Sequence, residues 1–188
     1  EMVPLMSLWL PIVLAAVLVF VASSIIHMVL GYHNTDFGKV RDEDGVMAAL
    51  RPFEIPPGEY VVPCAGSMKA MGTPEFQAKV KEGPVLFMNV FPPGMPGMGK
   101  NLALWFVYCL VVGVFAAYLT GRALAPGAEY LEVFRFAGTV AFTGYVLALW
   151  QAVIWMRRSA VTTLKSTFDG LIYALLTAGT FGWLWPAA

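Results

Sequence analysis

The chain has 188 residues, of which 59% are apolar and 13% are charged. A soluble domain usually has about 45–50% apolar and about 25% charged residues, so the composition excludes a water-facing globule and indicates an integral membrane protein. Twelve basic and twelve acidic residues cancel, so nothing in the charge balance favours nucleic acid as a partner.

The first apolar segment, residues 4–30, predicts a membrane helix. No basic residue precedes it, and it is longer than the apolar region of a secretory signal. We therefore expect a helix that stays in the mature protein rather than a signal peptide that is cleaved off. Residues 31–100 contain most of the charges and many prolines and glycines. They predict an extramembrane insert.

Within the insert, local signals predict two short helices and two short strands. We expect helices at residues 42–50, which begin with acidic side chains, and at 74–81, where Thr73 can cap and Pro74 suits the first position. We expect strands at 59–63 and 85–91, which are rich in valine and aromatic residues and bounded by glycine or proline. The insert is therefore interpreted as a small α+β unit.

Three further apolar segments follow the insert. Residues 101–121 carry no charge, and at about 1.5 Å per residue they extend roughly 31 Å, close to the thickness of a bilayer core. Residues 133–156 and 168–185 predict the third and fourth helices, the last preceded by a Ser166-x-x-Asp169 start signal. The expected fold class is a membrane all-α protein, with four transmembrane helices and the α+β insert between helices 1 and 2.

The distribution of basic residues predicts the orientation. The insert and the loop between helices 3 and 4 carry most of those near the membrane, namely Lys39, Arg41, Lys100, Arg157, Arg158 and Lys165, against Arg122 and Arg135 on the other side. The positive-inside rule then favours a cytoplasmic insert, with both chain ends outside the cytoplasm. Arg157 and Arg158 also form a candidate site for anionic lipid headgroups, although a topology anchor is the simpler interpretation.

Sulfur and imidazole side chains form a candidate copper set. His27, His33, Cys64, Met68 and Met71 are its central members, because thioether, thiolate and imidazole suit copper. Met88, Met95 and Met98 extend the set, and Met95 and Met98 repeat the three-residue spacing of Met68 and Met71. The alternative is that these methionines fill irregular packing and face lipid. Copper is the one cofactor that the residues point to, and none is firmly implied.

Other polar residues have ordinary structural interpretations. His27 lies one turn from Ser23, so an interfacial histidine bonded to a serine, a backbone carbonyl or a headgroup is an alternative to a ligand or proton relay. His33 is expected in a solvated loop. Asp169 is expected either to pair with Lys165 or to cap its helix. Small residues recur at helical spacing in the later segments, which suits close packing within one chain or between chains.

Three stretches together resemble uncharacterised four-span bacterial membrane proteins. They are Ser23-Ser24-Ile-Ile-His27-Met with Tyr32-His33 following, the segment 99–106, and residues 163–186. The resemblance implies a bacterial, inner-membrane protein and brings no activity with it.

We expect a non-catalytic accessory or scaffold subunit of a larger bacterial membrane complex, such as an energy-transducing one. The chain shows no catalytic triad, phosphate loop or zinc spacing, so catalysis is disfavoured and no catalytic residue is assigned. Lipid and other membrane subunits are the expected partners. A copper-handling membrane protein is the first alternative, and a membrane enzyme acting on a lipid or small molecule is the second.

Overall fold

A computed structural model describes residues 2–94 and 97–188 of the chain. The chain divides into two compact units, the helical unit Glu1–Phe37 with Gly97–Ala188 and the insert unit Gly38–Pro96. The fold is mostly helical, with one two-stranded sheet. Met95, a member of the extended copper set, lies outside the described residues.

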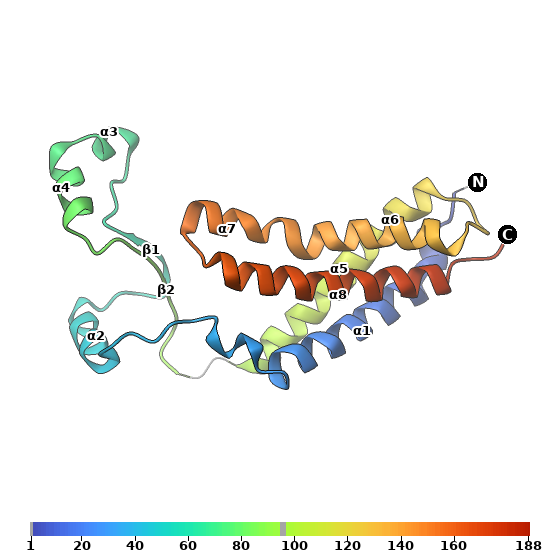
Figure 1. Cartoon of the computed structure of the whole chain (residues 1–188), viewed down its shortest axis with the longest axis horizontal. Helices are drawn as coiled ribbons and strands as arrows, with labels where there is room; N and C mark the ends of the chain where they lie inside the picture. Colours follow the sequence, from blue (N-terminus) through green and yellow to red (C-terminus); the bar gives the residue numbers. More distant parts are fainter. Residues whose placement is uncertain (1, 95–96) are drawn as a thin grey trace. The chain divides into compact units, whose positions relative to one another are not determined.

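Four long helical rods form the helical unit (Figure 1). The first is α1 (Trp9–Met28), preceded by the 3-10 turn Leu5–Leu8, and the second is α5 (Met98–Ala123). The third consists of α6 (Tyr130–Phe142), a π-helix at Thr143–Leu147 and α7 (Leu149–Met156). The fourth is α8 (Ala160–Trp183).

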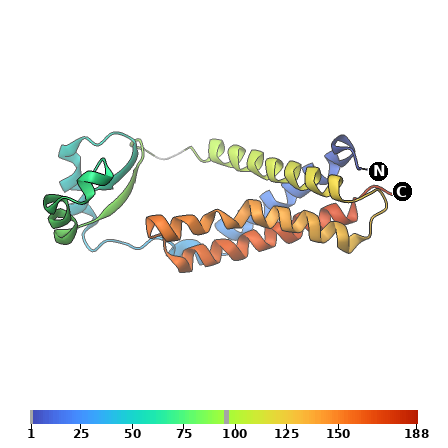
Figure 2. The ribbon, with the colours of Figure 1, turned by 90° about the horizontal axis from the view of Figure 1, so that it is seen from above.

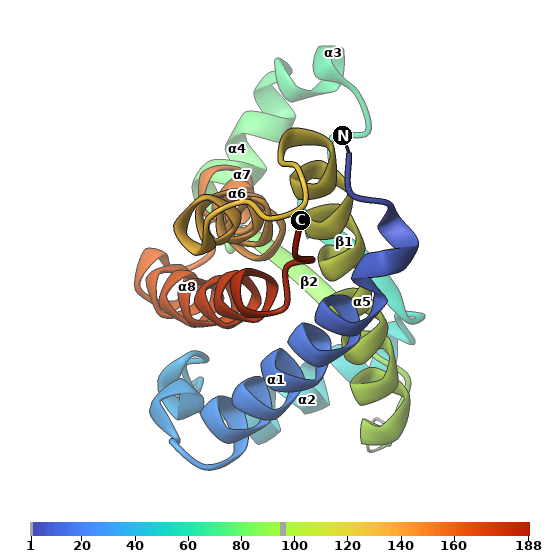
Figure 3. The same cartoon turned by 90° about the vertical axis from the view of Figure 1, so that its right-hand side faces the viewer.

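The four rods pack as a ring. Helix α1 lies against α5, α5 against α6, α6 against α8, and α8 closes back on α1, as the end-on view in Figure 3 shows. Figure 2 shows α6 and α7 following one line with α8 alongside. Each rod is a neighbour of the next in sequence, so the connectivity is that of an up-and-down bundle.

Among the described residues, three helices are long and apolar enough to cross a membrane: Leu5–Met28, Met98–Ala123 and Tyr130–Met156. In the most apolar 18-residue stretch of each helix, only 33%, 28% and 22%, respectively, is buried inside the structure. The rest is apolar surface, which suits contact with lipid chains. These helices correspond to the first three predicted spans and have the length and apolar character that a membrane span requires. Helix α8 is not among them, so the predicted count of four is not confirmed.

Small side chains allow the rods to approach closely. Ala116, Ala137 and Ala178 are fully buried, and a Cβ atom added to Gly121 would lie 2.8 Å from the carbonyl oxygen of Val3. A Cβ atom added to Gly170 would collide with the side chain of Val146. The small-residue faces predicted from the sequence therefore serve packing within this chain.

The insert unit contains α2 (Glu43–Leu50), α3 (Met68–Met71) and α4 (Pro74–Glu82), with strands β1 (Gly58–Val62) and β2 (Leu86–Val90). The strands pair antiparallel, with Gly58 opposite Val90 and Val62 opposite Leu86. The predicted strands and the helices at 42–50 and 74–81 are present, whereas α3 was not anticipated. Thr73 caps α4 by accepting a hydrogen bond from the Phe76 amide at 3.3 Å, as the sequence predicts.

Candidate functional site

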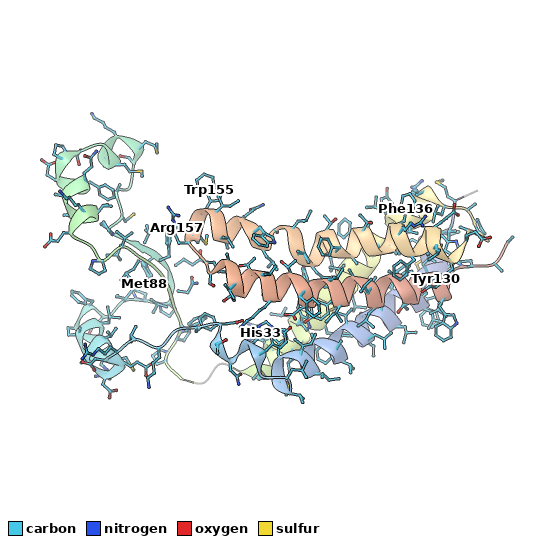
Figure 4. The ribbon with its side chains drawn as sticks, in the orientation of Figure 1. His33, Met88, Tyr130, Phe136, Trp155 and Arg157 are labelled. Carbon is cyan, nitrogen blue, oxygen red and sulfur yellow. The ribbon has the colours of Figure 1, made fainter. Side chains whose placement is uncertain are left out.

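The two histidines of the chain lie against each other at the end of α1. Helix α1 ends at Met28, and Gly31 then adopts a left-handed conformation with φ of 67° that turns the chain into a short 3-10 helix, Tyr32–Thr35. This turn brings His33 back over His27, with parallel rings whose centroids are 4.5 Å apart. Figure 4 shows His33 on this turn, beside α8.

His33 joins two carboxylates that are distant in sequence. Its Nδ1 lies 2.6 Å from Asp36 Oδ2, and its Nε2 lies 2.8 Å from Asp169 Oδ2 on α8. The side chain of His33 is only 12% exposed, and that of Asp169 is 3% exposed. The expectation that His33 lies in a solvated loop was wrong, because the turn after Gly31 folds it onto α8.

Lys165 fastens the same turn to α8. Its Nζ donates to the Tyr32 carbonyl oxygen at 2.7 Å, to Thr35 Oγ1 at 3.0 Å and to Asp36 Oδ1 at 2.9 Å. The sequence left two roles open for Asp169, an ion pair with Lys165 one turn earlier and a cap at the start of its helix. Asp169 bonds to His33 instead and lies within α8 rather than at its start. The three hydrogen bonds of Lys165 fix the position of His33.

The cluster pairs acidic with basic side chains. Asp36 and Asp169 supply two carboxyl groups, and Lys165 and His33 lie within bonding distance of them. Burial disfavours the ionised carboxyl of Asp36, but the hydrogen bonds from His33 and Lys165 outweigh it and hold the pKa of Asp36 below its usual value. Asp36 therefore stays a hydrogen-bond acceptor for both.

A groove of about 770 Å³ opens beside this cluster. His27, Asp169, Asn101 and three serines contribute polar groups to its lining, and Trp105 and three tyrosines are prominent in the rest. The π-helix supplies one of those tyrosines, Tyr145, and such helices are frequent at functional sites. Two buried atoms at the groove have no hydrogen-bond partner, Asp169 Oδ1 and Tyr173 Oη. A ligand in the groove could satisfy both.

The structure divides the predicted copper set between the two units. His27 and His33 belong to the helical unit, whereas Cys64, Met68 and Met71 belong to the insert unit. Cys64 is an exposed free thiol, and Met68 is 83% exposed. His27 Nδ1 bonds to the Ser23 carbonyl oxygen at 2.9 Å, which confirms the backbone bond considered for it.

The lipid-headgroup candidates Arg157 and Arg158 are exposed where α7 ends. Arg157 is the C-cap residue of α7, with φ of 56° (Figure 4), and headgroup binding there stays a prediction.

The sequence interpretation missed Asp36. The available signal was its position three residues after His33, within reach across a tight turn.

The chain matches no protein-family model, no curated protein and no solved structure. The resemblance to four-span bacterial membrane proteins therefore stays an interpretation of the sequence.

Proposed function

We propose that this protein is an accessory subunit of a larger bacterial membrane complex, and that the insert unit is the part that binds a partner. The observation that supports the proposal is that the insert lacks buried residues. None of the residues described between positions 38 and 94 is buried. An independent domain of about 60 residues buries about 60% of the surface that its unfolded chain exposes. The insert has secondary structure without a core of its own.

Several large apolar side chains of the insert stay open to solvent. Phe53 is 72% exposed, Phe87 on β2 is 56% exposed and Phe91 is 75% exposed. A two-stranded sheet also has two open edges, which can pair with a strand from another chain. A partner that covers these side chains would supply the missing core.

The charge of the insert favours a protein rather than an anionic membrane surface as that partner. Positions 38–96 contain six basic and seven acidic residues. A surface that binds anionic lipid usually gathers several lysines or arginines without matching acids. The balanced charge of the insert gives little attraction of that kind.

We also propose that α8 crosses the membrane as the fourth span of a bacterial inner-membrane protein. With 24 residues it extends about 36 Å, enough for a bilayer core. Its polar residues lower its hydropathy, but Asp169, Thr163 and Thr177 are buried in the bundle rather than presented to lipid.

Photo-crosslinking in the bacterium that encodes the chain tests the subunit proposal. A photoreactive phenylalanine analogue at Phe87 is expected to join the chain to one membrane protein, while the same analogue at Phe115 on α5, which is 59% exposed, contacts lipid. The same partner is expected by native mass determination in mild detergent, and Phe87→Asp should release it. A monomer that yields no crosslinked protein at Phe87 would contradict the proposal.

Thiol labelling tests the side on which the insert lies, which we propose to be the cytoplasm. Cys64 is exposed and Cys109 is buried, so a membrane-impermeant maleimide reports on Cys64. We expect labelling only after the cells are broken, and a Cys64→Ser variant serves as the blank. Labelling of intact cells, with the outer membrane made permeable, would place the insert outside the cytoplasm.

A further inference from the structure

The geometry points to a divalent transition-metal site formed by His27, His33 and Asp169 at the polar end of the groove. One ring nitrogen of each histidine and one carboxylate oxygen of Asp169 all lie within 4.8 Å of one another. This is the only such group of three among the described residues. It goes beyond the subunit proposal, which concerns the insert.

Hydrogen bonds fix which histidine nitrogens are free for a metal. His27 Nδ1 faces the Ser23 carbonyl oxygen, which can only accept, so Nδ1 holds the proton. His33 Nδ1 faces the carboxylate of Asp36 at 2.6 Å and also donates. Nε2 is therefore the ligand atom of both rings. Metal-binding histidines in proteins almost always donate their other nitrogen to a carbonyl or carboxylate oxygen in this way.

Asp169 supplies the third ligand and an independent sign that something is bound. The residue is 2% exposed, and its Oδ1 has no hydrogen-bond partner. An unpartnered oxygen of a buried carboxylate is costly, and a cation would satisfy it. His33 Nε2 and Asp169 Oδ2 are held 2.8 Å apart, so a metal would replace the proton between them.

The expected metal follows from the ligand set. Two imidazoles and one carboxylate suit Fe²⁺, Zn²⁺ and other borderline divalent ions, rather than the soft Cu⁺ that the thiol and thioethers of the insert would favour. In a tetrahedral site with metal–ligand distances near 2.1 Å, two ligand atoms lie about 3.4 Å apart. Metal binding would therefore draw separations of up to 4.8 Å together by up to about 1.4 Å, open the 2.8 Å contact between His33 and Asp169, and require the parallel rings to turn. His27 and Asp169 both line the groove, so remaining coordination positions would face it.

Loading the full-length chain with Co²⁺ tests the site. The chain is purified in mild detergent and stripped with a chelator, and Co²⁺ is followed by its visible absorption and by Zn²⁺ competition. We expect about one ion per chain. His27→Phe keeps a ring to stack on His33 and removes a ligand at an exposed position, so the fold should persist while binding is lost.

Two further variants separate ligand roles from general damage. Asp36→Asn should weaken binding by about 10–100-fold, because Asp36 supports the ligand His33 and is not itself a ligand, and His27→Phe should weaken it more. Asp44→Asn, on the exposed helix α2, is the matched control and should bind as the parent does. Negligible loading, or binding that survives His27→Phe but is lost when Cys64, Met68 and Met71 are replaced, would overturn the proposal.

Discussion

Replacement of Asp169 by alanine is expected to destabilise the helical unit by about 3–5 kcal/mol, the usual cost of removing one partner from a buried ion pair. Asp169 is 2% exposed and holds His33 Nε2 at 2.8 Å. Without it, His33 Nε2 faces a cavity instead of its hydrogen-bond partner, and Asp36 is left as the one carboxyl group bonded to both His33 and Lys165. The turn that Lys165 and His33 hold against α8 should then loosen.

Thermal and denaturant unfolding of the purified chain in detergent, with a chelator present, measures this effect without any metal. Asp169→Asn keeps the shape and one acceptor oxygen, so its loss should fall between those of the parent and Asp169→Ala. Asp44→Ala on exposed helix α2 is the control and should stay within about 0.5 kcal/mol of the parent. A similarly small loss for Asp169→Ala would show that the buried pair contributes no stability.

The elements of this fold that the sequence predicts well are those with local causes. Apolar length predicted the helices from Leu5, Met98 and Tyr130, because a bilayer requires about 20 apolar residues in a row. Acidic residues at the helix start predicted α2, and a Thr73 cap followed by Pro74 predicted α4. In the structure, Asp42 and Thr73 accept amide hydrogen bonds at these starts. Each of these signals acts over a few residues and does not depend on the rest of the chain.

The start of α8 shows where a local signal misleads. The Ser166-x-x-Asp169 pattern predicted a helix from residue 168, but α8 begins at Ala160, with Ser159 as its cap. Ser166 Oγ donates back to the Thr162 carbonyl oxygen at 3.1 Å, inside the helix. The polar residues that resembled a loop are accommodated by bonds along α8 and by contacts in the bundle.

The site itself depends on contacts between distant residues. His33 and Asp169 are separated by 136 positions, and Lys165 and Tyr32 by 133. No periodicity or spacing in the sequence encodes such pairs, since they follow from the order in which four rods close into a ring. The sequence grouped His27 and His33 with sulfur side chains of the insert, and it gave no sign that His33 would bond to the carboxyl group of Asp169.

Replacement of Phe181 by alanine is the second change with a large expected effect. Phe181 on α8 is fully buried, in a cluster with Leu8 and Ile12 from the first rod and Val133 from the third. Removing a buried phenylalanine ring costs about 3–5 kcal/mol in proteins, since the neighbours relax only partly into the cavity. We expect a loss of about 3 kcal/mol here, at the low end of that range. Lipid chains are as apolar as the interior of the bundle, so the substitution removes mainly the packing contacts of the ring.

Phe115 on α5 provides the matched control, because it is the same residue type on a helix of the same bundle but is 59% exposed. Phe115→Ala should change the stability by no more than about 0.5 kcal/mol, and Phe181→Leu should lose less than Phe181→Ala because it fills part of the space. Unfolding in mixed micelles measures the loss of unfolding free energy for Phe181→Ala, Phe181→Leu and Phe115→Ala. Equal losses at Phe181 and Phe115 would mean that the bundle does not close around Phe181. Neither change touches the histidine cluster, so metal loading should be retained in both variants.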